Sequence, residues 1–229
     1  MSFPFFFVVS MTSHQLLHHN IPPLQETDPH SKALAQMQRF HVQHLPVIAQ
    51  DQQYMGMLDE CTIPYLDQSA TVGKLPLLRI FVFDTAHVYE VLKCIQVHQL
   101  SAVAVLNHQE EYVGIITLSS VLSYMAVANS VQEIGGIISL EIGEYDYVLS
   151  EIARIVEAND AKILSLFAIP RNDNSHLLDV TLKINRTDLD MLITDFERYG
   201  YEIRATYQTN EYQDSAVEHY HSLMNYLNI

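Results

Sequence analysis

The stretch Tyr112-Val113-Gly114-Ile115-Ile116-Thr117 decides the fold, because Tyr54-Met55-Gly56-Met57-Leu58-Asp59 follows a similar pattern 58 positions earlier. An apolar run precedes each stretch, and a polar segment separates run and stretch, residues 49–53 in the first case and 107–111 in the second. Two apolar, largely β-branched runs that flank a polar segment predict a β-hairpin. The chain therefore contains one structural unit twice.

Each copy is predicted to begin with a short apolar strand, at residues 21–25 and 77–83, followed by a helix, the hairpin and a short closing helix. In the first copy Asp28 is expected to cap the helix, with Pro29 at its first position. In the second, the helix has a stripe at i, i+3, i+4 and i+7, formed by Val88, Val91, Leu92 and Ile95. Two such βαββα units bury more apolar surface as a pair than alone. We therefore expect one body with pseudo-twofold symmetry.

The motif of each copy is an apolar run of the type h-P-V-h, a polar turn, and then h-x-G-h-h-[ST]-x-x-[DN]. Over residues 12–127 this order of elements resembles a tandem pair of CBS domains. The resemblance implies one repeat at 12–68 and a second at 69–128, with Gly56 and Gly114 in equivalent places.

A third unit is expected over residues 134–208. Its periodicities predict strand, helix, strand, strand, helix and strand, which is the ferredoxin-like βαββαβ order. The stretch from Val148 to Glu157 resembles the first helix of ACT domains. The whole is thus an α+β / α/β chain, and a CBS pair followed by an ACT-like domain resembles the acetoin-utilisation regulatory protein family. That resemblance implies a non-catalytic, regulatory or metabolite-sensing protein.

In CBS pairs that bind nucleotides, a final Asp binds the ribose and a Ser or Thr three positions earlier contacts ribose or phosphate. Here the second copy has Thr117 followed by Ser120, and the first has Asp59 followed by Thr62, so neither copy carries the complete pair. No Lys or Arg occurs between Cys94 and Ala153. The resemblance therefore implies a weak site for AMP or another adenosine derivative of low negative charge. The alternative is that Thr117 and Ser120 only cap the closing helix.

The ACT-like unit also departs from its family. Ligand-binding members often carry a glycine at the end of the loop between the first strand and helix, where Tyr147 stands here. Gly143 and Asp146 belong to the same loop. Gly143 leaves the backbone some freedom, whereas Tyr147 is large enough to fill the pocket.

The composition of the chain limits the kinds of molecule that it is expected to bind. With 27 acidic and 12 basic side chains, the net charge is −15, which disfavours nucleic acid and anionic membrane surfaces. Two cysteines without a C-x-x-C spacing favour a reduced, cytoplasmic setting. The twelve histidines form no metal-binding motif, and no catalytic signature occurs, so we expect neither a metal site nor an enzyme.

The two ends of the chain stand apart from these units. Residues 1–11 form an apolar extension too short for a bilayer span, and residues 209–229 predict a helix with a capping box at Ser215 and Glu218. That helix docks on the body or forms a dimer contact. We expect a homodimer, a small-molecule effector and a regulated protein that the sequence does not identify. The competing hypothesis is a ligand-free interaction and dimerisation scaffold with degenerate sites.

Overall fold

The computed structural model describes residues 12–18, 20–63, 71–172 and 176–208. The predictions for residues 1–11 and for the tail from residue 209 lie outside these ranges. The chain divides into two compact units, residues 1–125 (unit 1) and 126–229 (unit 2). Among the described residues, no helix combines the length and apolar character that crossing a bilayer requires.

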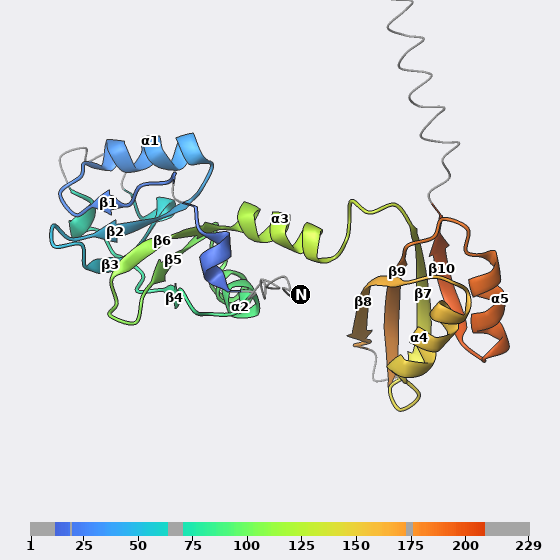
Figure 1. Cartoon of the computed structure of the whole chain (residues 1–229). Coiled ribbons are helices and arrows are strands. Elements are labelled where there is room, and N and C mark those ends of the chain that lie inside the picture. Colours follow the sequence, from blue (N-terminus) through green and yellow to red (C-terminus); the bar gives the residue numbers. More distant parts are fainter. Residues whose placement is uncertain (1–11, 19, 64–70, 173–175, 209–229) are drawn as a thin grey trace, which may run out of the picture. The chain divides into compact units, whose positions relative to one another are not determined.

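Unit 1 contains two three-stranded sheets of identical topology (Figure 1). In each sheet the first strand is parallel to the second, and the second is antiparallel to the third. The strands are β1 (Leu24–Gln25), β2 (His44–Ile48) and β3 (Tyr54–Asp59), and β4 (Phe81–Phe83), β5 (Ala102–Leu106) and β6 (Tyr112–Thr117). The helices are α1 (His30–Phe40) and α2 (Val88–His98), with a 3-10 turn, η2 (Glu60–Thr62), closing the first copy and α3 (Leu118–Ala128) closing the second.

The duplication extends to backbone details at the offset of 58. Both hairpins have a register shift, between Val47 and Ile48 and between Val105 and Leu106. Both helices end on a residue in the left-handed region, His41 at φ 54° and Gln99 at φ 51°. The predicted repeat and its hairpins are thereby confirmed.

The two copies form one body because each leading segment lies on the other copy. Thr12 pairs with His87 of the second copy, and Thr71, in the segment that leads into the second copy, pairs with Pro29 of the first. Short 3-10 turns, η1 (Ser13–Leu16) and η3 (Val72–Lys74), follow at these two places. In addition, the equivalent residues Gln53 and Glu111 bridge to each other. Equivalent residues meet in this way only near a twofold relation, as predicted.

Two details of the repeats differ from expectation. The helix α1 begins at His30, and its N-cap is Pro29, without a side-chain hydrogen bond. The predicted cap by Asp28 is wrong, because its carboxylate instead accepts the backbone N–H of Gln25 and pairs with Lys32 Nζ at 2.7 Å. The first strand of each copy is also shorter than predicted, and in the second copy Leu78, which was predicted to belong to it, pairs with Met57 of the first copy instead.

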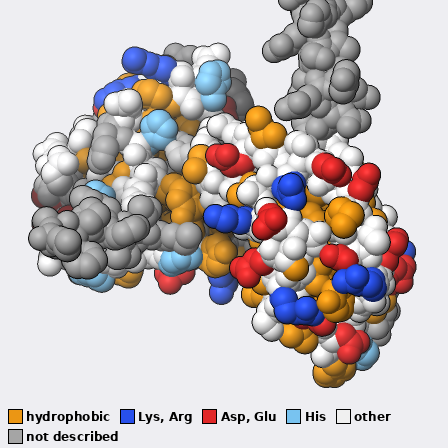
Figure 2. Space-filling model, turned by 45° about the vertical axis from the view of Figure 1, so that its right-hand side comes forward, with side chains coloured by type: hydrophobic (Ala, Val, Ile, Leu, Met, Phe, Trp, Pro, Cys, Tyr) orange, Lys and Arg blue, Asp and Glu red, His pale blue; other side chains and the backbone are white. Residues whose placement is uncertain are grey.

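Unit 2 has the predicted strand–helix order. Its elements are β7 (Gly136–Gly143), α4 (Leu149–Ala158), β8 (Ile163–Pro170), β9 (Leu177–Ile184), α5 (Asp190–Arg198) and β10 (Glu202–Tyr207). The antiparallel sheet has the order β10-β7-β9-β8, which places β8 and β10 at its edges (Figure 1). Alternate residues of β7 and β9 join the buried stripes of α4 and α5 in one core. Acidic and basic side chains are interspersed on the face of this unit that Figure 2 shows.

Candidate functional site

The motif residues of the two copies lie at equivalent strand ends. Asp59 ends β3 and is paired with His44, the first residue of β2. Thr117 ends β6 and is paired with Ala102, the first residue of β5. The same register therefore places both motif ends beside the start of the neighbouring strand, but it gives them different neighbours.

In the second copy the two motif hydroxyls contact each other. Thr117 is buried, and its Oγ1 accepts the backbone N–H of Ser120 at 3.1 Å. The Oγ atoms of Thr117 and Ser120 are 2.8 Å apart. This geometry satisfies a free N–H in the first turn of α3, as an N-cap does. A ligand hydroxyl would have to share or replace the Thr117–Ser120 contact.

In the first copy Asp59 occupies the corresponding place. Its Oδ1 accepts the backbone N–H of Cys61 at 2.9 Å, and its carbonyl accepts the hydroxyl of Thr62 at 2.7 Å. Asp59 is therefore the cap of η2, and its second carboxylate oxygen, Oδ2, faces His44. A negative charge at this position disfavours a phosphate group there.

A junction between the two copies, which the sequence motifs did not reveal, lies beside Asp59. His44 is 6% exposed, and its Nδ1 accepts the backbone N–H of Ser101 at 3.2 Å. The hydroxyl oxygen of Ser101 in turn accepts the N–H of Gln43 at 2.8 Å. Gln43 and Ser101 are themselves equivalent at the offset of 58, so they join across the pseudo-twofold relation.

The hydrogen bonds of this junction determine which ring nitrogen of the neutral His44 side chain carries the proton. Because Nδ1 accepts a backbone N–H, the neutral ring carries its proton on Nε2, which lies 4.0 Å from Asp59 Oδ2. Burial lowers the pKa of His44, and the nearby Asp59 opposes this effect only in part. His44 therefore presents a neutral donor beside a carboxylate acceptor.

A cavity of about 610 Å³ opens beside the junction. Its described lining comes from α1, from the segment between α1 and β2, from η2 and from the second copy: Leu34, Met37, Gln38, His41, Val42, Gln43, Glu60 and Ser101. These residues include Glu60 but no Lys or Arg, and Thr117 and Ser120 are not among them. Apolar side chains, amides and a carboxylate suit a neutral or cationic molecule better than a polyphosphate.

In unit 2 the loop that contains Gly143, Asp146 and Tyr147 is held together by contacts between its own residues. The N–H of Asp146 bonds to the carbonyl of Gly143 at 2.9 Å, and a Cβ added at Gly143 would lie 2.5 Å from Asp146 Oδ2. Tyr147 is half-buried and packs against the core of the unit. The three predicted residues lie in one loop, and the tyrosine occupies part of the space above the core.

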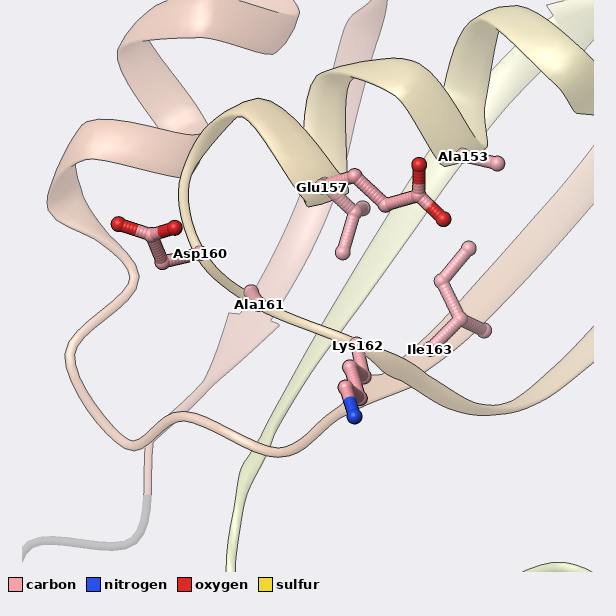
Figure 3. Close-up of a pocket in the computed structure, with 7 residues that line it drawn as sticks. Ala153, Glu157, Asp160, Ala161, Lys162 and Ile163 are labelled. Carbon is pink, nitrogen blue, oxygen red and sulfur yellow. The ribbon is translucent and has the colours of Figure 1, made fainter.

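A cavity of about 600 Å³ lies instead at the other end of α4 (Figure 3). Its described lining is Ala153, Val156, Glu157, Asp160, Ala161, Lys162 and Ile163. Figure 3 shows Glu157 and Ile163 on one side of the loop and the Asp160 carboxylate on the other. Sequence reasoning did not point to this place, because single charged residues at a helix end carry no distinctive pattern.

Within the described ranges, no group of three or more His, Cys, Asp or Glu side chains is arranged so that it could hold a metal ion. Cys61 and Cys94 are both free thiols.

Comparison with known proteins identifies a family model that the second repeat matches. Residues 77–127 match the family model of the CBS domain. The first repeat has the same strand order, pairing and register shift, so unit 1 has the architecture of a CBS pair.

Solved structures similar to this chain include a CBS domain pair/ACT domain protein from Thermotoga maritima, with 18% identity over 52% of this chain and 98% of that one, at a TM-score of 0.47. The CBS domains of a transcriptional regulator from Streptococcus pneumoniae are 22% identical over 49% of this chain and 97% of that one, with a TM-score of 0.45. CBSX2 in complex with AMP is 16% identical over 51% of this chain and 96% of that one, with a TM-score of 0.45.

Proposed function

We propose that this chain is a cytoplasmic, non-catalytic regulator whose CBS pair senses an adenosine-containing ligand of low negative charge. The observation that carries the proposal is the cavity that both copies line, with Gln43 and Glu60 from the first copy and Ser101, which also bonds to His44, from the second. A ligand bound there would contact both copies at once. Its binding free energy could therefore change how the copies are held together.

The charges near the junction support a nucleoside or AMP over ATP. Glu60 lines the cavity and Asp59 is adjacent, whereas no Lys or Arg is among its described lining residues. A triphosphate would add repulsion at this place without a cationic partner. AMP and adenosine should therefore bind more tightly than ATP.

Unit 2 is proposed to be an ACT-like domain with the ferredoxin-like plan, and the whole chain a member of the acetoin-utilisation regulatory family. The order βαββαβ and the antiparallel sheet support the first part. The self-contained loop at Gly143 and the position of Tyr147 favour a structural or dimerising role for this unit over amino-acid binding. The regulated partner is expected to be a protein.

A thermal-shift comparison of adenosine, AMP and ATP tests the sensor proposal. At a hundredfold excess over its dissociation constant, a ligand adds about 2.7 kcal/mol to the free energy of unfolding. For a chain of this size this corresponds to a rise in Tm of about 5–10 °C. Ser101→Ala should weaken the AMP response, because Ser101 lines the cavity and its hydroxyl oxygen accepts the N–H of Gln43, whereas Ser119→Ala, at an exposed residue outside the described lining, should keep it.

One observation favours the scaffold alternative. Thr117 and Ser120 already satisfy each other in the second copy, so that site is complete without a ligand. If no adenosine compound raises Tm at millimolar concentration, the sensor proposal is wrong, and an interaction scaffold explains the same residues.

A further inference from the structure

The two faces of the sheet in unit 2 differ in what covers them. On one face, alternate residues of β7 and β9 are buried in one core together with the apolar stripes of α4 and α5. The intervening residues of β7 and β9 point to the other face, and all of them remain partly exposed. We call this second side the open face. An antiparallel sheet that leaves one face to solvent normally has polar side chains there.

The strand register arranges the open face in rows that cross all four strands. In the order β10, β7, β9 and β8, one row is Tyr207, Ile137, Lys183 and Ser165, and the next row is Ala205, Ser139, Thr181 and Phe167. Lys183 is the only charged residue of these eight. Tyr207 and Phe167, on the two edge strands, are 63% and 42% exposed. The two rows therefore form a band of low charge, which we call the open band.

The next row of the open face is charged, and its charges compensate one another. The side chain of Glu141 is only 10% exposed and pairs with the guanidinium groups of Arg171 and Arg204. Arg171 Nε also lies 3.8 Å from Asp179 Oδ2. This end of the face has the polarity that solvent exposure favours, whereas the open band lacks it.

The described part of the chain ends beside the open band. Tyr207 belongs to the first row, and the tail from residue 209 follows one residue later. In the sequence, the capping box at Ser215 and Glu218 predicts a helix in this tail. The apolar stripe of that helix is Val217, Tyr220, Met224 and Leu227. A helix with a single apolar stripe is stable when the stripe is buried against another element, so the tail and the open band have matching requirements.

The length and the charge of the tail also fit the open band. A helix over residues 215–227 is about 20 Å long, and four strands spaced about 4.8 Å apart span about 14 Å, so the helix can cross the whole sheet. Residues 208–214 can extend over about 20 Å, which lets the helix return onto the face. Residues 209–229 contain three acidic side chains and no Lys or Arg, which suits the single cation of the band, Lys183.

We propose that the C-terminal helix docks with its apolar stripe on the open band of its own unit 2. The helix is tethered next to the band at Tyr207, so it reaches the surface at a high effective concentration. A separate partner would have to lose its translational and rotational freedom on binding. The docked helix gives unit 2 a third layer, with helices on both faces of the sheet.

Oxidation of side chains by hydroxyl radicals, measured by mass spectrometry on the full-length protein, tests this docking. Tyr145, which is 87% exposed, serves as the internal reference. In wild type, Tyr207 should be oxidised much more slowly than Tyr145. Two carboxylates in the stripe, Tyr220→Asp with Met224→Asp, should shift the docking equilibrium by about a hundredfold toward the undocked tail. Tyr207 should then react about as fast as Tyr145. Ser222→Asp is the matched control, because it adds a charge on the opposite side of the predicted helix, and Tyr207 should stay protected.

A substitution on the sheet tests the same contact from the other side. Thr181→Asp places a charge in the open band, and because Thr181 is partly exposed the sheet should still form. The variant should release the tail, so that Tyr207 and Tyr220 are both oxidised faster than in wild type. If Thr181→Asp leaves both residues protected, the tail does not occupy the open band.

A mixture of isotope-labelled wild type and the unlabelled double variant, unfolded and refolded together, shows whose tail covers the band. Protection should remain on the labelled Tyr207 and be absent from the unlabelled Tyr207. Protection of the unlabelled Tyr207 overturns docking on the chain's own unit. A wild-type Tyr207 that reacts as fast as Tyr145 overturns the proposal, and so does protection that survives the double substitution. The AMP response does not involve the open band and should persist in the double variant, so each proposal can fail without the other.

Discussion

The two copies of the repeat share one backbone but carry different side chains at the ends of their motif strands. Strand pairing, register shifts and helix ends coincide at an offset of 58 residues. At the start of the second strand, however, the first copy has His44 where the second has Ala102. This difference indicates that local backbone geometry and core packing maintain the fold of such a repeat. The side chains at the motif ends can differ between the copies without changing that fold.

The left-handed residues illustrate this point. Gln52 and Glu110 occupy equivalent hairpin positions at φ 68° and 61°, although neither is a glycine. At both positions the backbone N–H donates to the carbonyl three residues earlier, from Gln52 to Ala49 and from Glu110 to Asn107. The surrounding turn therefore sets the conformation, not the residue type.

The largest expected difference between the copies concerns their equivalent glycines. Gly56 has φ 154°, and a Cβ there would lie 2.8 Å from Leu77 Cβ and 3.1 Å from a backbone oxygen of Leu78. At Gly114 the nearest contact is the flexible end of Leu17, at 2.9 Å. Gly56→Ala should lower the free energy of unfolding by about 3 kcal/mol, and Gly114→Ala by about 1 kcal/mol.

Urea denaturation of both variants measures this difference, with Gly200→Ala as a further comparison, because a Cβ at Gly200 would meet no atom within 4 Å although φ is 84°. Equal losses at Gly56 and Gly114 would mean that the copies are more alike than their surroundings indicate.

The second difference concerns the motif ends. Ser120→Asp introduces the carboxylate that the second copy lacks, and a charged hydrogen bond to ribose should tighten AMP binding by about 1.5–3 kcal/mol, roughly ten- to a hundredfold. Thr62→Asp makes the same change in the first copy, where Asp59 already repels phosphate, so its affinity should not rise. Isothermal titration of both variants with AMP decides the matter; a gain from Thr62→Asp would contradict the role assigned to Asp59.

The third difference is a pH dependence at the start of the second strand, where the first copy has His44 and the second has Ala102. Burial lowers the pKa of His44 below its usual value near 6.5, although Asp59 acts against this. As the pH falls, the unfolded chain therefore takes up a proton at His44 before the folded protein does. The contribution of His44 to the free energy of unfolding is complete above about pH 6.5 and is lost below it.

Unfolding by urea at a series of pH values from about 7.5 to about 5.5 tests this sign, with His44→Gln as the control. Glutamine can still accept the Ser101 N–H but does not titrate, so the variant should lose less stability on acidification than wild type. A variant as acid-sensitive as wild type would place the pH dependence elsewhere.

Periodicity and turn chemistry predicted most of the fold. The helix stripe of Val88, Val91 and Ile95, the two hairpins and the order of elements in unit 2 all follow from spacings within a short stretch of chain. The cap at Asp28 was predicted wrongly, because the Asp28 carboxylate accepts the backbone N–H of Gln25 and pairs with Lys32 instead.

The site was only partly predictable. Asp59, Thr62, Thr117 and Ser120 were predicted from their places in the motif. The structure puts Asp59 and Thr117 at equivalent strand ends, with Thr62 in η2 and Ser120 in α3. The contact between His44 and Ser101 joins residues 57 positions apart. Neither residue is unusual in its own stretch, so only the offset of 58, applied to Gln43 and Ser101, could have placed them together.

The smallest expected effect concerns a feature that the two copies share, the left-handed residue at the end of each helix. His41 and Gln99 each end a helix in the left-handed region, where a side chain costs about 1 kcal/mol and glycine costs nothing sterically. Part of that gain is lost because glycine has more freedom in the unfolded chain. His41→Gly and Gln99→Gly should therefore each raise the free energy of unfolding by about 0.5 kcal/mol, and their effects should add, since the two helix ends share no hydrogen bond among the described contacts. Thermal or urea denaturation of the single and double variants measures the gain from each substitution and shows whether the two gains add. A gain at one position with a loss at the other would show that the equivalent backbone angles are held by different forces in the two copies.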